Sequence, residues 1–92
     1  VTIDLESREV RKDGKPVELT VKEFDLLIQL IRNKNVALQR RRLYELVWKE
    51  PGYNAENTVA VHIRKIREKI EIDPKNPRYL KVVWGIGYKM EK

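Results

Sequence analysis

The 92-residue sequence predicts an α+β domain, with antiparallel strands first, three helices next and a β-hairpin at the end. Three observations predict this fold class. The start of the chain alternates between apolar and polar residues around an Asp-Gly pair, and the middle carries apolar residues at helical spacing. The end has two short apolar runs around a Gly-x-Gly pair. This length suits one domain, residues 1–92, with a modest core that needs no disulfide or metal.

The first strands are predicted at residues 1–5, where apolar and polar side chains alternate, and at residues 9–19. In the second segment, 9–12 leads into Asp13-Gly14, a strong hairpin-turn pair, and 15–19 runs back. Because the chain is already strand-like at Val1 and does not begin with Met, we expect it to be a piece of a longer protein.

The first helix is predicted to begin after Thr20 and to run to about Asn33, because Thr20 and Glu23 form a capping box. Asn35 is the expected left-handed C-cap. The apolar positions at helical spacing, which predict the buried stripe, are Phe24, Leu27, Ile28 and Ile31.

A second helix is predicted from about Arg40 to Trp48. Its inward residues are Leu43, Leu46 and Val47. The segment 49–55 then contains a Pro-Gly pair, which breaks the helical pattern and predicts a loop.

The third helix, predicted over 57–71, has two faces that suit different partners. A stripe of branched aliphatic residues predicts burial: Val59, Ile63, Ile66 and Ile70. The opposite face carries Asn57, Val61, Arg64, Lys65 and Glu68, with Thr58, His62 and Arg67 on the flanks. Arg and Lys can bind phosphates or guanine edges and Asn can bind adenine, so this face suits the DNA major groove. Taken alone, a solvated basic surface helix explains the same residues.

Two short strands, Tyr79–Val83 and Tyr88–Met90, close the chain around 84–87. Gly85 and Gly87 are predicted to supply positive φ in this turn. A helix pair with a basic second member, followed by a β-hairpin, predicts a winged helix-turn-helix. In that architecture the second helix enters the major groove, and the hairpin reaches an adjacent minor groove or the backbone.

Charge favours a polyanionic partner. The net charge is +6, and residues 1–36 contribute none of it, since they hold seven basic and seven acidic residues. Residues 37–92 hold thirteen basic and seven acidic side chains. Nucleic acid is a better match than an anionic membrane, because the basic helix lacks a continuous apolar insertion face.

Composition argues against other function classes. The sequence has no cysteine and one histidine, so no thiolate metal site or disulfide exists and His62 has no second His with which to share a metal. We expect no enzyme activity and no cofactor, since no phosphate-cradling glycine loop and no paired carboxylates in an apolar setting are present. No membrane span or secretory signal is visible, and the lack of cysteine suits the cytoplasm.

Candidate DNA contacts follow from these placements. Arg64 is the first candidate for base reading, and Val61 suits a thymine methyl, because an outward aliphatic group has little other purpose. Phosphate contacts are expected from His62 and Arg67. Further contacts with the DNA sugar-phosphate backbone are predicted for Arg40 with its neighbours 41–42, Trp48, Lys81 and Trp84. Tyr88 could equally pack on the core or donate its hydroxyl to a phosphate.

The whole chain resembles the DNA-binding effector domain of OmpR/PhoB-family response regulators of bacterial two-component systems. The resemblance rests on the ordered motifs Leu19-Thr20-x-x-Glu23-Phe24-x-Leu26-Leu27, Leu43-x-x-x-Val47-Trp48, Thr58-Val59-x-Val61-His62-Ile63-Arg64-x-x-Arg67 and Gly85-x-Gly87-Tyr88. The segment 84–88 looks most like VanR-type members.

The resemblance implies partners and further parts. It implies a four-stranded N-terminal sheet, of which this chain starts at the second strand, and tandem homodimer binding to direct-repeat promoter sites. It also implies a phosphorylatable receiver domain before Val1. The loop expected to meet RNA polymerase is Lys49, Glu50, Pro51, Gly52, Tyr53, Asn54 and Ala55.

The sequence departs from the family pattern at several positions. Asn57 stands where Arg is frequent and Ala60 where Asp is frequent, which removes an acid-base pair near the start of the third helix. Trp84 replaces a wing Arg, so insertion of a charge into the minor groove cannot be carried over. Gln39 replaces a Ser N-cap and Arg41 a Glu, which weakens the start of the second helix.

Two other binding classes remain open at this point. A winged-helix protein-interaction module could dock 49–55 and the basic face on an acidic partner, and would show little affinity for duplex DNA. RNA binding is less favoured, because one Phe, four Tyr and two Trp leave few aromatic platforms for stacking.

Overall fold

The computed structural model describes residues 1–53 and 55–91 and begins with a three-stranded antiparallel sheet. Its strands are β1 (Thr2–Asp4), β2 (Glu9–Lys12) and β3 (Lys15–Val17), in the order β1-β2-β3. Val10 faces Ile3 on one side and Val17 on the other, and is 2% exposed. The predicted turn is confirmed, because Asp13 and Gly14 have φ of 53° and 78°, the left-handed pair that a tight hairpin needs.

Helix α1 (Val21–Arg32) begins at the predicted capping box. The Glu23 amide donates to Thr20 Oγ1 at 3.1 Å, and the Thr20 amide donates to Glu23 Oε1 at 3.0 Å. The predicted C-cap was wrong: Asn33 is the cap, and its backbone and side-chain nitrogens both donate to the Gln29 carbonyl. Asn35 is left-handed, with φ 65°, but it lies beyond the cap and donates its amide to Met90 O at 2.8 Å.

Helix α2 (Arg40–Trp48) has the predicted bounds, and Lys49 ends it in a left-handed conformation with φ 58°. Helix α3 (Glu56–Ile70) begins and ends one residue earlier than predicted. Its C-cap, Glu71, is extended and donates its amide to Arg67 O at 2.9 Å. Among the described residues, no helix has both the length and the apolar character that a membrane crossing requires.

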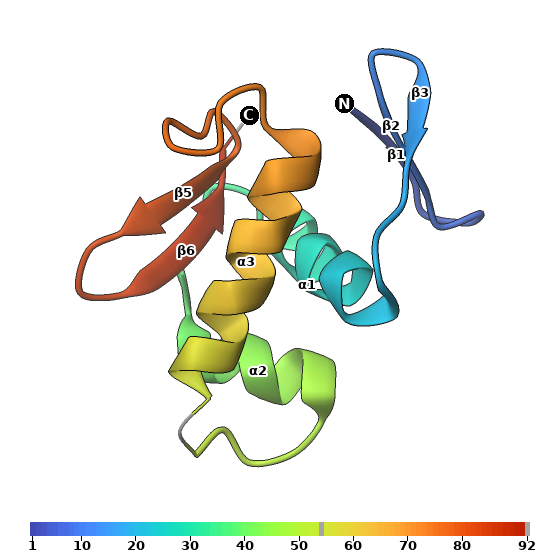
Figure 1. Ribbon diagram of the computed structural model, residues 1–92. Coiled ribbons are helices and arrows are strands. Elements are labelled where there is room, and N and C mark those ends of the chain that lie inside the picture. The colour runs from blue at the N-terminus through green and yellow to red at the C-terminus, as the bar shows by residue number, and fades with distance from the viewer. Residues whose placement is uncertain (54, 92) are drawn as a thin grey trace.

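The closing hairpin forms the second sheet, with β5 (Leu80–Val83) and β6 (Gly87–Met90). A short strand that the sequence did not predict, β4 (Leu38–Gln39), pairs with β6, so the order is β4-β6-β5. The sequence does not predict β4 because a strand of two residues is too short to show an alternating pattern of apolar and polar side chains. We call β5, β6 and their connecting turn the wing; Figure 1 shows it to one side of α3.

Gly87 corrects a prediction. Of the two wing glycines, Gly85 has the predicted positive φ, 78°, but Gly87 does not. A Cβ on Gly87 would lie 2.0 Å from the Leu38 carbonyl oxygen. Glycine is required there because β4 approaches β6 closely, not because of backbone conformation.

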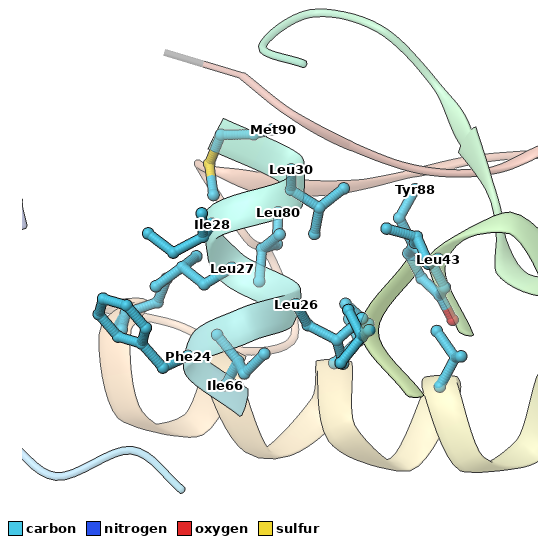
Figure 2. Packing of buried hydrophobic residues seen from close by; sticks show 14 of the residues in the cluster. Phe24, Leu26, Leu27, Ile28, Leu30, Leu43, Ile66, Leu80, Tyr88 and Met90 are labelled. Carbon is cyan, nitrogen blue, oxygen red and sulfur yellow. The ribbon is translucent and has the colours of Figure 1, made fainter. Parts of the chain in front are cut away.

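The hydrophobic core lies where the three helices meet the wing, and Figure 2 shows side chains from all of them in one cluster. All four predicted residues of α3 are buried: Val59, Ile63, Ile66 and Ile70. Helix α1 buries more than its predicted stripe: Leu26 and Leu30 are 0% exposed, while Ile31 lies at the edge of the core. The extra burial follows from its position, since α1 packs on α2, α3 and β6 at once.

The α2–α3 pair followed by the β5–β6 hairpin is a winged helix-turn-helix, as predicted. The N-terminal sheet has three strands in this chain. Burial of the α3 stripe fixes which side of that helix faces outward.

Candidate nucleic-acid interface

The outer face of α3 displays the predicted polar and basic residues. Asn57, Arg64 and Lys65 are exposed, while Thr58 and Val61 are half-buried. Because Ile63 and Ile66 are 0% exposed on the opposite side, rotation of α3 about its axis would bury charge, so this presentation is fixed by the core.

Arg64 and Lys65 are the exposed basic residues on the outer face of α3. Within residues 1–53 and 55–91, no acidic side chain forms an ion pair with either of them. Lys69, one turn further on, is different: its Nζ lies 2.6 Å from Glu23 Oε1. The charge that faces solvent on α3 is therefore available to an anionic partner.

Arg67, which is expected on the flank of α3 as a phosphate contact, bonds to the wing. Its Nε and one Nη donate to the Leu80 carbonyl oxygen at 3.1 and 2.9 Å, and its guanidinium lies 5.6 Å from the centre of the Tyr88 ring. Burial lowers the pKa of Arg67, and the neighbouring Tyr88 and Glu71 oppose that shift. The cause of this contact is β5, which brings the Leu80 carbonyl oxygen beside α3. Arg67 thus connects α3 to the wing.

Tyr88 takes the core-packing role of the two that the sequence left open. It is 5% exposed, and the guanidinium groups of Arg40 and Arg67 lie 5.4 and 5.6 Å from its ring centre. These contacts join the start of α2, the flank of α3 and β6.

The N-terminus of α2 lacks the usual protein caps. Gln39 makes no side-chain capping bond, and the first turn holds no acidic residue. The turn instead begins with Arg40, Arg41 and Arg42. Arg40 Nε is buried and has no hydrogen-bond partner among the described residues. Free amides, the helix dipole and clustered guanidinium groups together favour an anion at this end.

Trp48 lies in an aromatic stack against α3. Its ring stacks on Tyr44 with centroids 4.8 Å apart and meets His62 edge-on at 5.0 Å. Lys22 Nζ lies 5.5 Å from the Trp48 ring centre. His62 is half-buried, and its Nδ1 lies 2.7 Å from the Thr58 carbonyl oxygen. His62 and Trp48 therefore hold each other in position between α2 and α3.

The wing carries both charged and apolar exposed residues. Lys81 is half-buried and lies 3.9 Å from Glu91, which also pairs with Lys89 at 2.9 Å. Trp84, at the turn, is 91% exposed.

The loop 49–55 is fastened to α2 at several points, and Asn54 lies outside the described residues. The Gly52 amide donates to Glu45 Oε2 at 3.4 Å, and the Tyr44 hydroxyl donates to Glu50. That bond to Glu50 raises the pKa of Tyr44. Tyr53 is 76% exposed. The loop therefore presents one aromatic side chain on an ordered base.

Sequence reasoning missed the role of Glu71. This carboxylate is 1% exposed and accepts from the backbone amides of Arg78, Tyr79 and Leu80 at 2.8 to 3.3 Å. It fixes the point where the chain leaves the linker and enters β5. Its only sequence signal is a position between the end of a helical pattern and a Pro-containing linker.

A basic groove was also missed. A cavity of about 760 Å³ lies between the α3–β5 linker and the wing, and its cationic lining residues are Arg67, Lys75, Arg78 and Lys81. Residues 75 and 78 are scattered in a linker without periodicity, so no pattern predicted their convergence. In the described part of the chain, no group of His, Cys, Asp or Glu side chains could hold a metal ion.

Comparison with known proteins agrees with this geometry. The family model described as "Transcriptional regulatory protein, C terminal" matches residues 14–90. The uncharacterized transcriptional regulatory protein YcbL of Bacillus subtilis is 40% identical over 98% of this chain, and the sensory transduction protein RegX3 of Mycolicibacterium smegmatis is 43% identical over 99%. This chain spans 40% of the length of each of them.

Solved structures share the fold. The response regulator DrrB of Thermotoga maritima, an OmpR/PhoB homolog, superposes with a TM-score of 0.89 at 37% identity, over 98% of this chain and 41% of that one. The RstA DNA-binding domain of Klebsiella pneumoniae, solved in complex with the RstA box, superposes with a TM-score of 0.87 at 26% identity, over 97% and 88%.

Proposed function

Because this chain belongs to the transcriptional regulatory protein C-terminal family, the OmpR/PhoB-type DNA-binding domains of two-component response regulators, we propose that α3 enters the DNA major groove and reads base sequence there. The observation that carries this proposal is that Arg64 and Lys65, which form no ion pair within the described residues, lie on a face that the buried α3 stripe fixes.

Base reading is assigned to the outer residues of α3. Arg64 can donate two parallel bonds to guanine O6 and N7, and Asn57 can bind adenine in the same bidentate manner. The Val61 side chain suits a thymine methyl, and Thr58 and Lys65 lie on the same surface. Each good bidentate contact discriminates by about 1–3 kcal/mol against the wrong base.

Phosphate contacts are assigned to groups that border α3. The uncapped start of α2 with Arg40 offers amides and a buried Nε without a protein acceptor among the described residues. His62 and Trp48 border the start of α3, and Lys81 lies on the wing strand. Contacts of this kind fix register and supply salt-sensitive affinity but little sequence information.

Further partners are proposed for the whole protein. This chain spans 40% of its curated relatives, which leaves room for a receiver domain before Val1. We propose tandem homodimer binding to direct-repeat promoter sites and contact of the loop 49–55 with RNA polymerase, and family membership supports both. Tyr53 is the exposed residue of that loop most suited to a protein contact. A cytoplasmic location and the lack of enzyme activity belong to the same proposal.

A selection of duplexes followed by binding titrations tests the proposed function. The domain is used to select duplexes from a random library, and binding to the selected duplex and a scrambled one is followed by fluorescence anisotropy at several salt concentrations. We expect preference for the selected duplex, and a plot of log affinity against log salt concentration with a slope of about −0.9 per neutralised phosphate. Equal binding to both duplexes would refute sequence reading, and failure to enrich any duplex would favour docking on an acidic protein.

A further inference from the structure

The turn of the wing presents an apolar surface to solvent. Trp84 is 91% exposed, Ile86 beside it is 49% exposed, and Val82 on β5 is 39% exposed. A large aromatic group left in water forgoes burial worth about 25 cal/mol per Å². An indole exposed to this extent therefore favours a partner that covers it.

The turn that carries Trp84 is ordered by its own bonds. The Ile86 amide donates to the Val83 carbonyl at 3.0 Å, and Gly85 adopts φ 78° between them. Below the turn, Val83 pairs with Gly87 and Val82 with Tyr88. Trp84 therefore sits at the end of a closed hairpin and not on a loose loop.

The hairpin is held rigidly at its base. Gly87 leaves no room between β6 and β4, and Arg67 joins β5 to α3 through the Leu80 carbonyl. Figure 1 shows the turn projecting away from the three helices. An apolar side chain on a fixed arm can be pushed into a narrow groove without first being ordered, which lowers the entropic cost of insertion.

The net charge of the chain and the small area of the exposed apolar surface indicate which partner covers it. A second copy of this chain also carries +6, so association through the wing would bring like charges together. Three exposed apolar side chains also cannot cover the roughly 800 Å² that each partner buries in a standard protein interface. A duplex held by the basic face satisfies both conditions, because it is anionic and its minor groove accepts single apolar side chains.

We propose that Trp84, supported by Ile86, is an apolar wedge that enters the minor groove next to the site read by α3, partly unstacks one base step and kinks the duplex. This inference rests on the proposed function, since α3 must first bind the major groove. It deepens that function by adding sequence preference at a step that α3 does not touch.

Insertion of Trp84 predicts which base steps in the DNA are favoured next to the wing. Pyrimidine–purine steps such as TA unstack most easily, so they should be favoured under the wing.

The test uses the selected duplex with 2-aminopurine placed at each step of the flank facing the wing. With the wild-type domain, we expect 2-aminopurine emission to rise at one step as stacking is lost. On an unlabelled duplex, the difference in tryptophan emission between the wild type and Trp84→Phe isolates the emission of Trp84. This tryptophan emission should become shielded from acrylamide in the saturated complex. Trp84→Ala should lose about tenfold in affinity, a typical cost of one lost stacking contact.

Two variants complete the design. Trp84→Arg places a charge at this position without the wedge, so it should bind the duplex but give no 2-aminopurine rise. Ile72→Ala removes an apolar side chain that is 71% exposed in the linker and should match the wild type.

The outcomes separate the two proposals. Trp84 that stays as open to acrylamide in the complex as in the free domain would overturn the wedge while leaving DNA binding intact. So would an unchanged 2-aminopurine rise in Trp84→Ala. A wild-type domain that binds no selected duplex would overturn the proposed function, and the wedge with it.

Discussion

The guanidinium of Arg67 donates two hydrogen bonds to the carbonyl oxygen of Leu80, at 3.1 and 2.9 Å, and so joins α3 to β5. The two residues are thirteen apart in sequence and belong to the two elements that are proposed to contact DNA. Arg67 therefore acts with the shared core and the buried Glu71 carboxylate to fix the relative position of helix and wing.

Replacement of Arg67 by Ala should destabilise the domain and loosen β5. A hydrogen bond to a charged group contributes about 1.5–3 kcal/mol, so urea denaturation should show a loss of that order. Hydrogen exchange should accelerate in β5 more than in α1. Lys81→Ala, on the same strand, is the control and should stay within about 0.5 kcal/mol of the wild type. Equal exchange rates in β5 for Arg67→Ala and the wild type would contradict the connection.

The ion pair between Glu23 and Lys69 predicts a pH effect on stability. Burial opposes ionisation of Glu23, but the bonds from Lys69 and the Thr20 amide hold its pKa below the ordinary 4.5. Because the folded-state pKa is the lower one, the stabilisation is present above pH 4.5 and is lost as the pH falls through the depressed pKa. Glu23→Gln retains the capping bonds without the charge.

Urea denaturation between about pH 5 and about pH 3 checks this effect. The free energy of unfolding should fall more steeply with acid for the wild type than for Glu23→Gln. Glu18→Gln, at an exposed position, should follow the wild type. If Glu23→Gln and the wild type keep the same slope, Glu23 does not contribute in this way.

Gly87→Ala should be more damaging than Gly14→Ala. A methyl group at Gly87 would lie 2.0 Å from the backbone oxygen of Leu38, so β4 must separate from β6. Gly14 has open space around its Cβ position but φ of 78°, and the strain there should cost about 1 kcal/mol. Thermal denaturation of the two variants compares them. A larger loss for Gly14→Ala would show that the close approach of β4 is not rigid.

Val59 and Val61, two residues apart on α3, should respond to truncation in different ways. Val59 is 0% exposed, so Val59→Ala should lower stability by about 1–3 kcal/mol. Val61→Ala should preserve stability but weaken binding to the selected duplex. Uracil in place of the contacted thymine should weaken the wild type to the same extent and should have no further effect on Val61→Ala. Additive losses would show that Val61 does not meet a thymine methyl.

Much of the fold could be predicted from the sequence because local signals agreed with each other. The capping box at Thr20 predicted the start of α1, and Asp13-Gly14 predicted the turn between β2 and β3. The apolar stripe of Val59, Ile63, Ile66 and Ile70 predicted which side of α3 is buried. What could not be predicted depends on contacts between distant segments. β4 exists because Leu38 meets Tyr88, and Gly87 is glycine because of Leu38.

In the candidate site, too, local patterns were predictable from the sequence and contacts between distant segments were not. Exposure of Asn57, Arg64 and Lys65 followed from helical periodicity. The turn of Arg67 inward to Leu80 did not, because a carbonyl on a strand thirteen residues away leaves no pattern. Glu71, which binds three amides at the start of β5, was missed for the same reason.

The most direct test of the central claim compares Arg64→Ala with Lys81→Ala on the selected duplex and its scrambled control, by anisotropy at fixed salt. Arg64→Ala should lose about 1–3 kcal/mol on the selected duplex and much less on the scrambled one, because a base contact is absent from the scrambled complex. Lys81→Ala should weaken both duplexes alike. Equal losses for Arg64→Ala on the two duplexes would contradict base reading by α3.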